Sequence, residues 1–148
     1  MFLGSFKYSI DSKGRVSLPA KLRKAVNPDA NDTFVMTRGL EKCIEVHPKD
    51  MWAENIEARL NMLNSFNKNH TAFLRRYLEK AAEDTLDSQA RLSIPQNLIE
   101  YAGIKKEVMI IGMNKNIEFW DPEEYEKYLE SQELSFEELA NDVMNKTM

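Results

Sequence analysis

The sequence predicts an α+β protein in which two copies of one β-β-α-β-β unit combine into a single barrel flanked by helices. First, residues 11–19 align without gaps with residues 87–95, at a constant offset of 76 residues. Second, apolar and polar residues alternate along short segments next to each aligned stretch, as they do in half-buried strands. Third, apolar residues recur at helical spacing between the copies and after the second copy.

The first copy contains the signals for four strands and one helix. A short alternating segment at residues 8–10 is followed by a polar turn and a second strand at residues 15–18. Pro19 then stands where proline is favoured, in the first turn of a helix. Residues 34–37 and 43–47 are expected to form a hairpin joined through a glycine.

The second copy repeats this order. Strands are expected at residues 84–86 and 91–94, a helix after Pro95, and a hairpin from residues 108–113 and 116–120. Because such a unit leaves an exposed sheet edge, two copies related by a pseudo-twofold axis would cover each other's apolar faces. The sequence therefore predicts one closed or split barrel built from two halves.

Helical patterns divide the rest of the chain. Apolar residues spaced as in amphipathic helices occupy residues 51–63, residues 73–81 and residues 125–143. We accordingly expect four segments. Residues 1–50 form a first barrel repeat, residues 51–83 a connecting helical hairpin, residues 84–122 a second barrel repeat and residues 123–148 acidic C-terminal helices.

The composition is that of a folded globular protein, with 43% hydrophobic and 30% charged residues. The longest apolar run, residues 108–112, is far shorter than a membrane-spanning helix, and the N-terminus shows no secretory leader. We therefore expect a cytoplasmic protein. One cysteine, Cys43, and two histidines provide neither an internal disulfide nor zinc-ligand spacing, and no cofactor is expected.

The charge is distributed unevenly. The net charge of −4 argues at face value against a nucleic-acid partner. However, the negative charge is concentrated near the C-terminus, because residues 118–148 hold 10 acidic and 2 basic residues, whereas residues 1–117 hold 14 acidic and 18 basic ones. Residues 1–24 alone contain six basic residues against one acid. This segment is the predicted anion-binding surface.

The pattern Asp-x-x-x-Arg occurs in both copies, as Asp11 with Arg15 and as Asp87 with Arg91. An arginine at a turn can present a bidentate fork to phosphate or to guanine O6 and N7, and it can equally pair with the aspartate and hold the turn. Turn aspartates usually bond their own backbone, so we assign Asp11 and Asp87 a structural role. We assign Arg15 to DNA, because Lys13 is adjacent and Lys7 is near, and leave both interpretations open for Arg91.

The remaining charged residues suggest simpler roles. Basic residues 21, 23 and 24 are typical of a solvated helix face, with at best non-specific phosphate contacts. Arg75 and Arg76 are expected to pair with acids of a neighbouring subunit rather than with phosphate. The acidic residues after position 122 read as a solubilising face, with a DNA-mimicking tail as the alternative.

Catalytic patterns are missing from the sequence, so we do not expect an enzyme. It holds no Gly-x-Ser-x-Gly elbow, no glycine-rich phosphate loop and no His-x-x-x-His helix. His47 is expected to be a packing residue at a strand end that matches Trp120, and His70 to lie in a polar linker.

The repeated residues resemble those of the MraZ family, bacterial transcription regulators of the AbrB-like swapped-hairpin class. The resemblance covers nearly the whole chain and includes Gly4-Ser5-Phe6, both Asp-x-x-x-Arg patterns, Phe73-Leu74-Arg75 before Ala81-Ala82-Glu83, and Ala102-Gly103-Ile104. The second turn reads Gln89-Ala90-Arg91, where the family typically has glycine in the middle. Because alanine tolerates a left-handed backbone poorly, we expect this turn to be shaped differently.

The resemblance implies a double-split β-barrel of swapped hairpins and a protein that binds short direct repeats of double-stranded DNA upstream of the division and cell-wall operon. It further implies a homo-oligomeric ring, often an octamer, and a nucleoid location. We expect DNA contacts from Lys7, Lys13, Arg15, Gln89 and Arg91, and turns held by Asp11, Gly14 and Asp87. The alternative is an antitoxin-like barrel that binds another protein without sequence-specific DNA binding.

Overall fold

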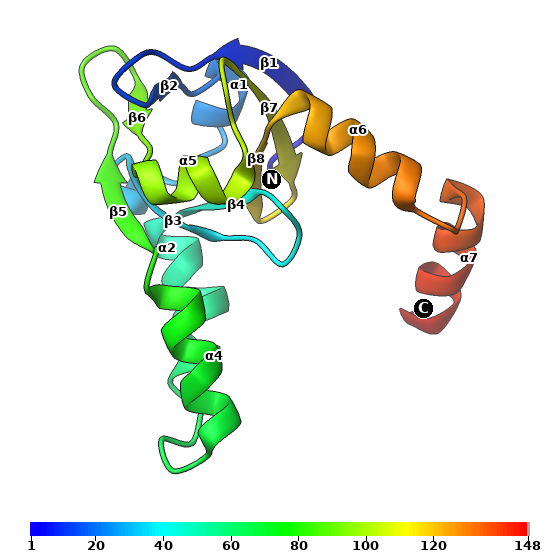
Figure 1. Cartoon of the computed structure of the whole chain (residues 1–148). Helices are drawn as coiled ribbons and strands as arrows, with labels where there is room; N and C mark the ends of the chain where they lie inside the picture. The colour runs from blue at the N-terminus through cyan, green and yellow to red at the C-terminus, as the bar shows by residue number, and fades with distance from the viewer. Residues whose placement is uncertain (148) are drawn as a thin grey trace.

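The computed structural model describes residues 1–147, with side chains through residue 145, so the last residue of the predicted segment 123–148 lies outside the described part (Figure 1). The first copy contains the expected β-β-α-β-β order and an additional 3-10 turn. Its elements are β1 (Ser5–Ser9), β2 (Arg15–Ser17), α1 (Ala20–Arg23), η1 (Pro28–Ala30), β3 (Thr33–Arg38) and β4 (Ile44–Pro48).

The second copy has the same order without the 3-10 turn. Its elements are β5 (Ala82–Thr85), β6 (Arg91–Ser93), α5 (Gln96–Ala102), β7 (Glu107–Met113) and β8 (Asn116–Trp120). Helices α1 and α5 both begin directly after a proline. Pro19 and Pro95 are N-caps with extended ψ angles of 140° and 141°, so they precede the first turn in which the sequence analysis placed them. The α+β class and the twofold repetition predicted from the sequence are confirmed.

The two copies interleave. The main antiparallel sheet has the order β1-β7-β8-β4-β3-β5, and β2 pairs with β6 in a separate two-stranded ribbon. Exchanging the copies maps each sheet onto itself, and the central pairs are Val16 opposite Leu92 in the ribbon and Glu45 opposite Glu118 in the sheet. A pseudo-twofold axis therefore runs through the ribbon and the middle of the large sheet.

The segments around each Asp-x-x-x-Arg turn differ from a simple hairpin. Strands β1 and β2 flank the first turn as predicted, but β1 pairs with β7 and β2 pairs with β6, both from the other copy. Strand β5 likewise pairs with β3 rather than with β6. Only the hairpins β3–β4 and β7–β8 pair within their own copy, as the sequence predicted.

One core fills the space between the ribbon and the inner face of the large sheet. Each strand alternates inward and outward residues, so that both sheets and both short helices contribute to it. The completely enclosed side chains belong to all of these elements and include Leu22, Phe34, Met36, Ile44, Leu92, Leu98, Ile110, Ile117 and Phe119. Because no half has a core of its own, neither copy is expected to fold alone.

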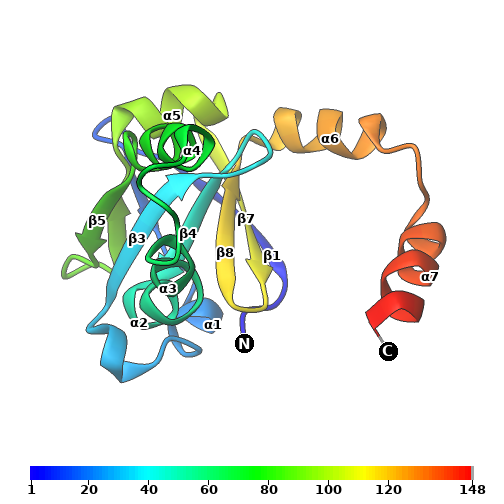
Figure 2. The same cartoon turned by 90° about the horizontal axis from the view of Figure 1, so that it is seen from below.

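Two helical projections leave this barrel, and Figures 1 and 2 show them pointing in different directions. The connecting hairpin consists of α2 (Lys49–Trp52), the π-helical segment η2 (Ala53–Glu57), α3 (Ala58–Leu60) and α4 (Lys68–Leu78). Trp52 of α2 stacks on Tyr77 of α4 with ring centroids 6.1 Å apart, which holds the two arms of the hairpin together. Trp52 also meets the ring of His47 on β4 edge-to-face, which attaches the hairpin to the sheet. The C-terminal projection consists of α6 (Pro122–Ser131) and α7 (Phe136–Thr147).

The histidine predictions had different outcomes. His47 is buried and meets Trp52 edge-to-face at 5.5 Å, which confirms a packing position. The prediction that His70 lies in a polar linker is wrong, because α4 already begins at Lys68. The Asn67 side chain accepts hydrogen bonds from the backbone N–H groups of Asn69 and His70, so the polar run is a helix cap.

Candidate nucleic-acid interface

The first Asp-x-x-x-Arg turn is closed around the carboxylate of Asp11. Its Oδ1 accepts hydrogen bonds from the backbone N–H groups of Lys13 at 2.9 Å and Arg15 at 2.8 Å, and its Oδ2 accepts one from Arg15 Nε at 2.7 Å. The backbone N–H of Arg15, assisted by its side chain and by the N–H of Lys13, lowers the pKa of Asp11 below its ordinary value. Asp11 is therefore an ionised turn residue, as the sequence indicated.

The second turn has the same shape. Asp87 accepts hydrogen bonds from the backbone of Gln89 at 2.8 Å and of Arg91 at 3.0 Å, and from Arg91 Nε at 2.9 Å. The expectation that Ala90 would change this turn is wrong, since Ala90 adopts a left-handed φ of 58°, close to the 77° of Gly14. The three hydrogen bonds to one carboxylate hold the alanine in a conformation it does not favour by itself.

The β2–β6 ribbon brings the two turns together. Val16 and Leu92 point into the core, so the flanking residues of both strands point outward. Arg15 and Arg91 thus share one outward face, and Arg91 Nη1 lies 3.9 Å from Asp11 Oδ2. The ribbon also joins the turns by backbone hydrogen bonds from Ile94 N–H to Gly14 and from Leu18 N–H to Ala90.

The two interpretations of Arg15 are both represented in this geometry. Its Nε is bound to Asp11, which is the pairing role. The two terminal amino groups of Arg15 form no hydrogen bond within residues 1–147, and its side chain remains 29% exposed. The Arg91 side chain is 23% exposed, and its Nε is bound to Asp87. Its Nη1 also forms a 3.9 Å ion pair with Asp11, so Arg91 is engaged by both aspartates. Each aspartate therefore orients a guanidinium whose outer edge can still bind a ligand.

The other predicted contact residues surround this face unequally. Lys13 and Gln89 are exposed on the two turns, next to the arginines. Lys7 lies instead on β1 of the large sheet, with its Nζ 3.9 Å from Glu107 Oε1. Phe6 and Tyr8 on either side of Lys7 pack against the core, so Lys7 points away from it.

Sequence reasoning missed two residues of the ribbon face. Ser17 and Ser93 lie on the same outward side as the arginines, each directly opposite the arginine of the other strand. The signal was present, because each serine follows its arginine by two positions, which is the period of a strand. It could not be used without knowing that the two strands pair.

Metal-ligand clusters and membrane helices are two further features relevant to function. Among residues 1–147 no cluster of three potential metal ligands is found, and no helix there is long and apolar enough to span a membrane. Cys43 is buried, and this burial, together with the nearby Glu118 and Glu45, raises the pKa of its thiol far above the ordinary value. The basic residues Lys21 and Arg23 of α1 and its C-cap Lys24 are exposed.

Comparison with known proteins places the chain clearly. The family model described as "MraZ protein, putative antitoxin-like" matches twice, over residues 1–76 and 77–146. A protein of Natranaerobius thermophilus named "Transcriptional regulator MraZ" is 41% identical over 98% of both chains. A protein of the same name from Halothermothrix orenii is 44% identical over 95% of this chain and 94% of the relative. Another, from Desulforamulus reducens, is 38% identical over 98% of this chain and 99% of the relative. With the repeated turn on one ribbon and full-length similarity to these proteins, this chain belongs to the MraZ family.

Proposed function

We propose that this chain is a transcription regulator, like the relatives whose names say so, and that it binds direct repeats of DNA upstream of the division and cell-wall operon. The observation that supports this best is the placement of Arg15 and Arg91 on one outward face, each oriented by its own aspartate. In this proposal the protein acts by binding rather than by catalysis, in the cytoplasm and at the nucleoid.

A two-stranded ribbon is one of the elements with which proteins read DNA. The major groove of B-DNA admits a two-stranded antiparallel ribbon, and an arginine that donates two parallel hydrogen bonds to guanine O6 and N7 is the commonest specific contact there. With Nε held by aspartate, the terminal amino groups of Arg15 and Arg91 are the donors left for such a contact. Lys13 and Gln89 are exposed on the turns and, in this proposal, would meet phosphate at the groove edge.

Assembly would convert weak contacts into tight binding. The chain carries a net charge of −4, so a single ribbon competes with the repulsion of the rest of the molecule. In a homo-oligomeric ring, such as the octamer, several ribbons would engage neighbouring repeats, and the second contact would form at high effective concentration. The proposal therefore couples affinity to the number of repeats in the DNA.

The test is a mobility-shift assay with the protein's own upstream region, carrying one repeat or several, over a range of salt concentrations. Arg15→Ala should weaken binding about 5- to 150-fold per lost contact, which corresponds to about 1–3 kcal/mol. Lys13→Ala should instead reduce the salt dependence by about one phosphate contact. Lys68→Ala also removes one positive charge, from the exposed surface of α4, and is the matched control.

The family description keeps the antitoxin-like alternative relevant. In that case the barrel would bind another protein, and Arg15→Ala would leave DNA binding unchanged in a folded oligomer. Binding that neither decreases with salt nor increases with the number of repeats would also contradict the proposal.

A further inference from the structure

The C-terminal helix α7 is an amphipathic helix that lies away from the barrel (Figures 1 and 2). Phe136, Leu139 and Met144 follow helical spacing and are 78%, 37% and 52% exposed, with acidic residues between them. Ser135 and Glu138 cap its N-terminus reciprocally, at 3.1 and 3.2 Å. The helix is therefore preformed, and a row of large apolar side chains on such a helix is typical of a docking face.

The preceding helix α6 fixes where this arm points. Asp121 caps it, and the ring of Trp120 contacts Tyr125 and Tyr128 at centroid distances of 5.2 and 5.1 Å. Glu124 adds an ion pair to Lys42 at 3.1 Å. Because α6 is held at its root, α7 is kept at a distance from its own barrel.

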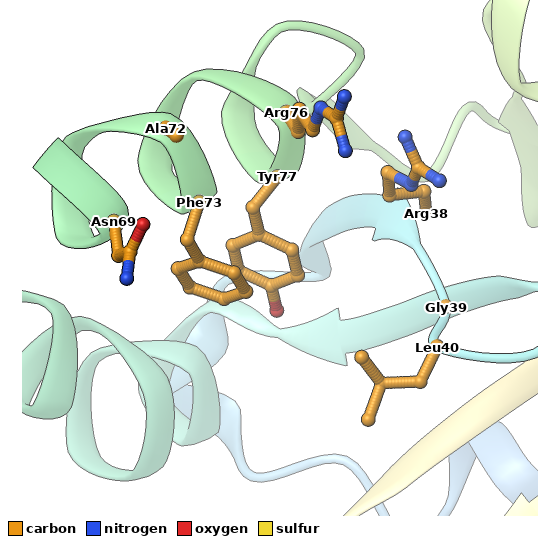
Figure 3. Close-up of a pocket in the computed structure, with 8 residues that line it drawn as sticks. All are labelled: Arg38, Gly39, Leu40, Asn69, Ala72, Phe73, Arg76 and Tyr77. Atoms are coloured by element: carbon orange, nitrogen blue, oxygen red, sulfur yellow. The ribbon is translucent and has the colours of Figure 1, made fainter.

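A groove of complementary character lies between the β3–β4 loop and the connecting helical hairpin. Figure 3 shows its first part, a hollow of about 380 Å³ between Leu40 and the face of α4 that carries Phe73 and Tyr77. A second hollow of about 410 Å³ shares these three residues and continues along Ile56, Leu60 and Leu63 of the hairpin. Leu40 is 90% exposed and Phe73 44% exposed, so the groove is open and its floor is apolar.

The rim of this groove is cationic. Arg38 and Arg76 both line the first hollow and lie at the same end of it in Figure 3, and Arg59 lines the second. None of the three forms an ion pair with a carboxylate among the residues that the structure describes, although Arg38 lies 4.6 Å from the centre of the Tyr101 ring. Glu45 is the one acid that lines either hollow. The groove thus matches a helix with an apolar face and acidic flanks.

We propose that this groove receives helix α7 of a second copy of the chain. Phe136 and Leu139 would cover Leu40 and Phe73, and the acidic residues of α7 would face the three arginines. The anchored α6 favours a second copy over the chain's own arm. Since each chain has one arm and one groove on different parts of its surface, the contact is heterologous, and copies add until a closed set is complete.

Cross-linking can identify the occupant of the groove directly. Leu40→Cys and Phe136→Cys are introduced into separate full-length chains with different tags, mixed, and treated with a short bismaleimide, while the native Cys43 remains buried. A linked pair containing one chain of each kind is the expected result. Lys24→Cys, at the exposed residue that follows α1, replaces Leu40→Cys in the control and should give no such pair.

Two other outcomes would overturn the proposal. A further chain carries both Leu40→Cys and Phe136→Cys. Linkage only within this chain, and none between the separately tagged chains, would mean that the arm folds back on its own groove. No linkage at all would mean that the groove and the arm do not meet.

Light scattering of the purified protein gives an independent measurement. The wild type should have a mass of more than one chain, and Phe136→Asp and Arg76→Glu should lower it while the circular dichroism stays unchanged. Phe66→Asp alters a phenylalanine outside the groove that is even more exposed than Phe136, and it should leave the mass unchanged. A monomeric wild type, or equal dissociation by Phe136→Asp and Phe66→Asp, contradicts the proposed contact. The mobility-shift assay with Arg15→Ala tests the DNA contact of the ribbon separately, so failure of the contact between arm and groove can be told apart from failure of the proposed DNA binding.

Discussion

Replacing Gly14 by alanine tests how the first turn is built. Gly14 has a left-handed φ of +77°, and an added Cβ would lie 3.0 Å from the backbone oxygen of Ile94 and 3.2 Å from Ile99 Cδ1. A left-handed conformation costs a non-glycine residue about 1–2 kcal/mol, and crowding in a packed region adds to this. The carbonyl of Ile94 cannot easily move away, because the neighbouring N–H of Ile94 is bonded to Gly14.

We therefore expect Gly14→Ala to lower the free energy of unfolding by about 2–3 kcal/mol. Urea unfolding at one fixed protein concentration measures this as a midpoint lowered by about 1–2 M. The second turn provides the matched control, since Ala90→Gly removes a Cβ at a φ of 58° and should stabilise by up to about 1 kcal/mol. An unchanged midpoint for Gly14→Ala, or equal destabilisation by both variants, would refute the reasoning.

Three further measurements follow from buried groups. Burial, with Glu45 adding, raises the pKa of Glu118, so the folded protein loses stability as the pH rises through this value. Glu118→Gln keeps the acceptor for Trp120 Nε1 and should be more stable than the wild type at pH 7. The difference in stability should disappear below pH 4.5, the ordinary pKa of glutamate, and a gain that persists below this pH contradicts the reasoning. The Tyr101 hydroxyl donates to the backbone oxygens of Gly39 and Glu41 at 2.8 and 3.1 Å. Tyr101→Phe should therefore lower the free energy of unfolding by about 1 kcal/mol and speed hydrogen exchange of the Gly39 amide. Unchanged exchange would exclude this role of Tyr101. Cys43 should react with iodoacetamide only after unfolding, because burial keeps its thiol protonated, and rapid modification of the native protein would disprove this.

Much of the fold could be predicted because its signals are local. The hairpins β3–β4 and β7–β8 join strands that are close in sequence, and Pro19 and Pro95 mark the starts of the two short helices. The Asp-x-x-x-Arg turns are equally local, since each carboxylate binds groups at most four residues away. The error at His70 had a local cause as well, because an asparagine cap and a polar linker have the same composition.

The interface was only partly predictable. Each arginine could be found by its motif, but Ser17 and Ser93 acquire a place beside the arginines only when β2 pairs with β6. Lys7 is near Arg15 in sequence, yet it lies on the large sheet beside Glu107. The shape of the second turn was mispredicted because the intrinsic preference of Ala90 was weighed without the hydrogen bonds that override it.

The sequence by itself determined the repeated unit, its turns and its helices, because hydrogen bonds and side-chain periodicity within a few residues define them. Only the tertiary structure decided that the copies interleave, that Arg15 and Arg91 share one face, and that an acidic arm and a cationic groove lie on separate projections. These features depend on burying Val16 against Leu92, 76 residues away, and on packing α6 against Trp120. Contacts between distant segments leave no periodic signal in a single sequence, since they form only when the whole core closes.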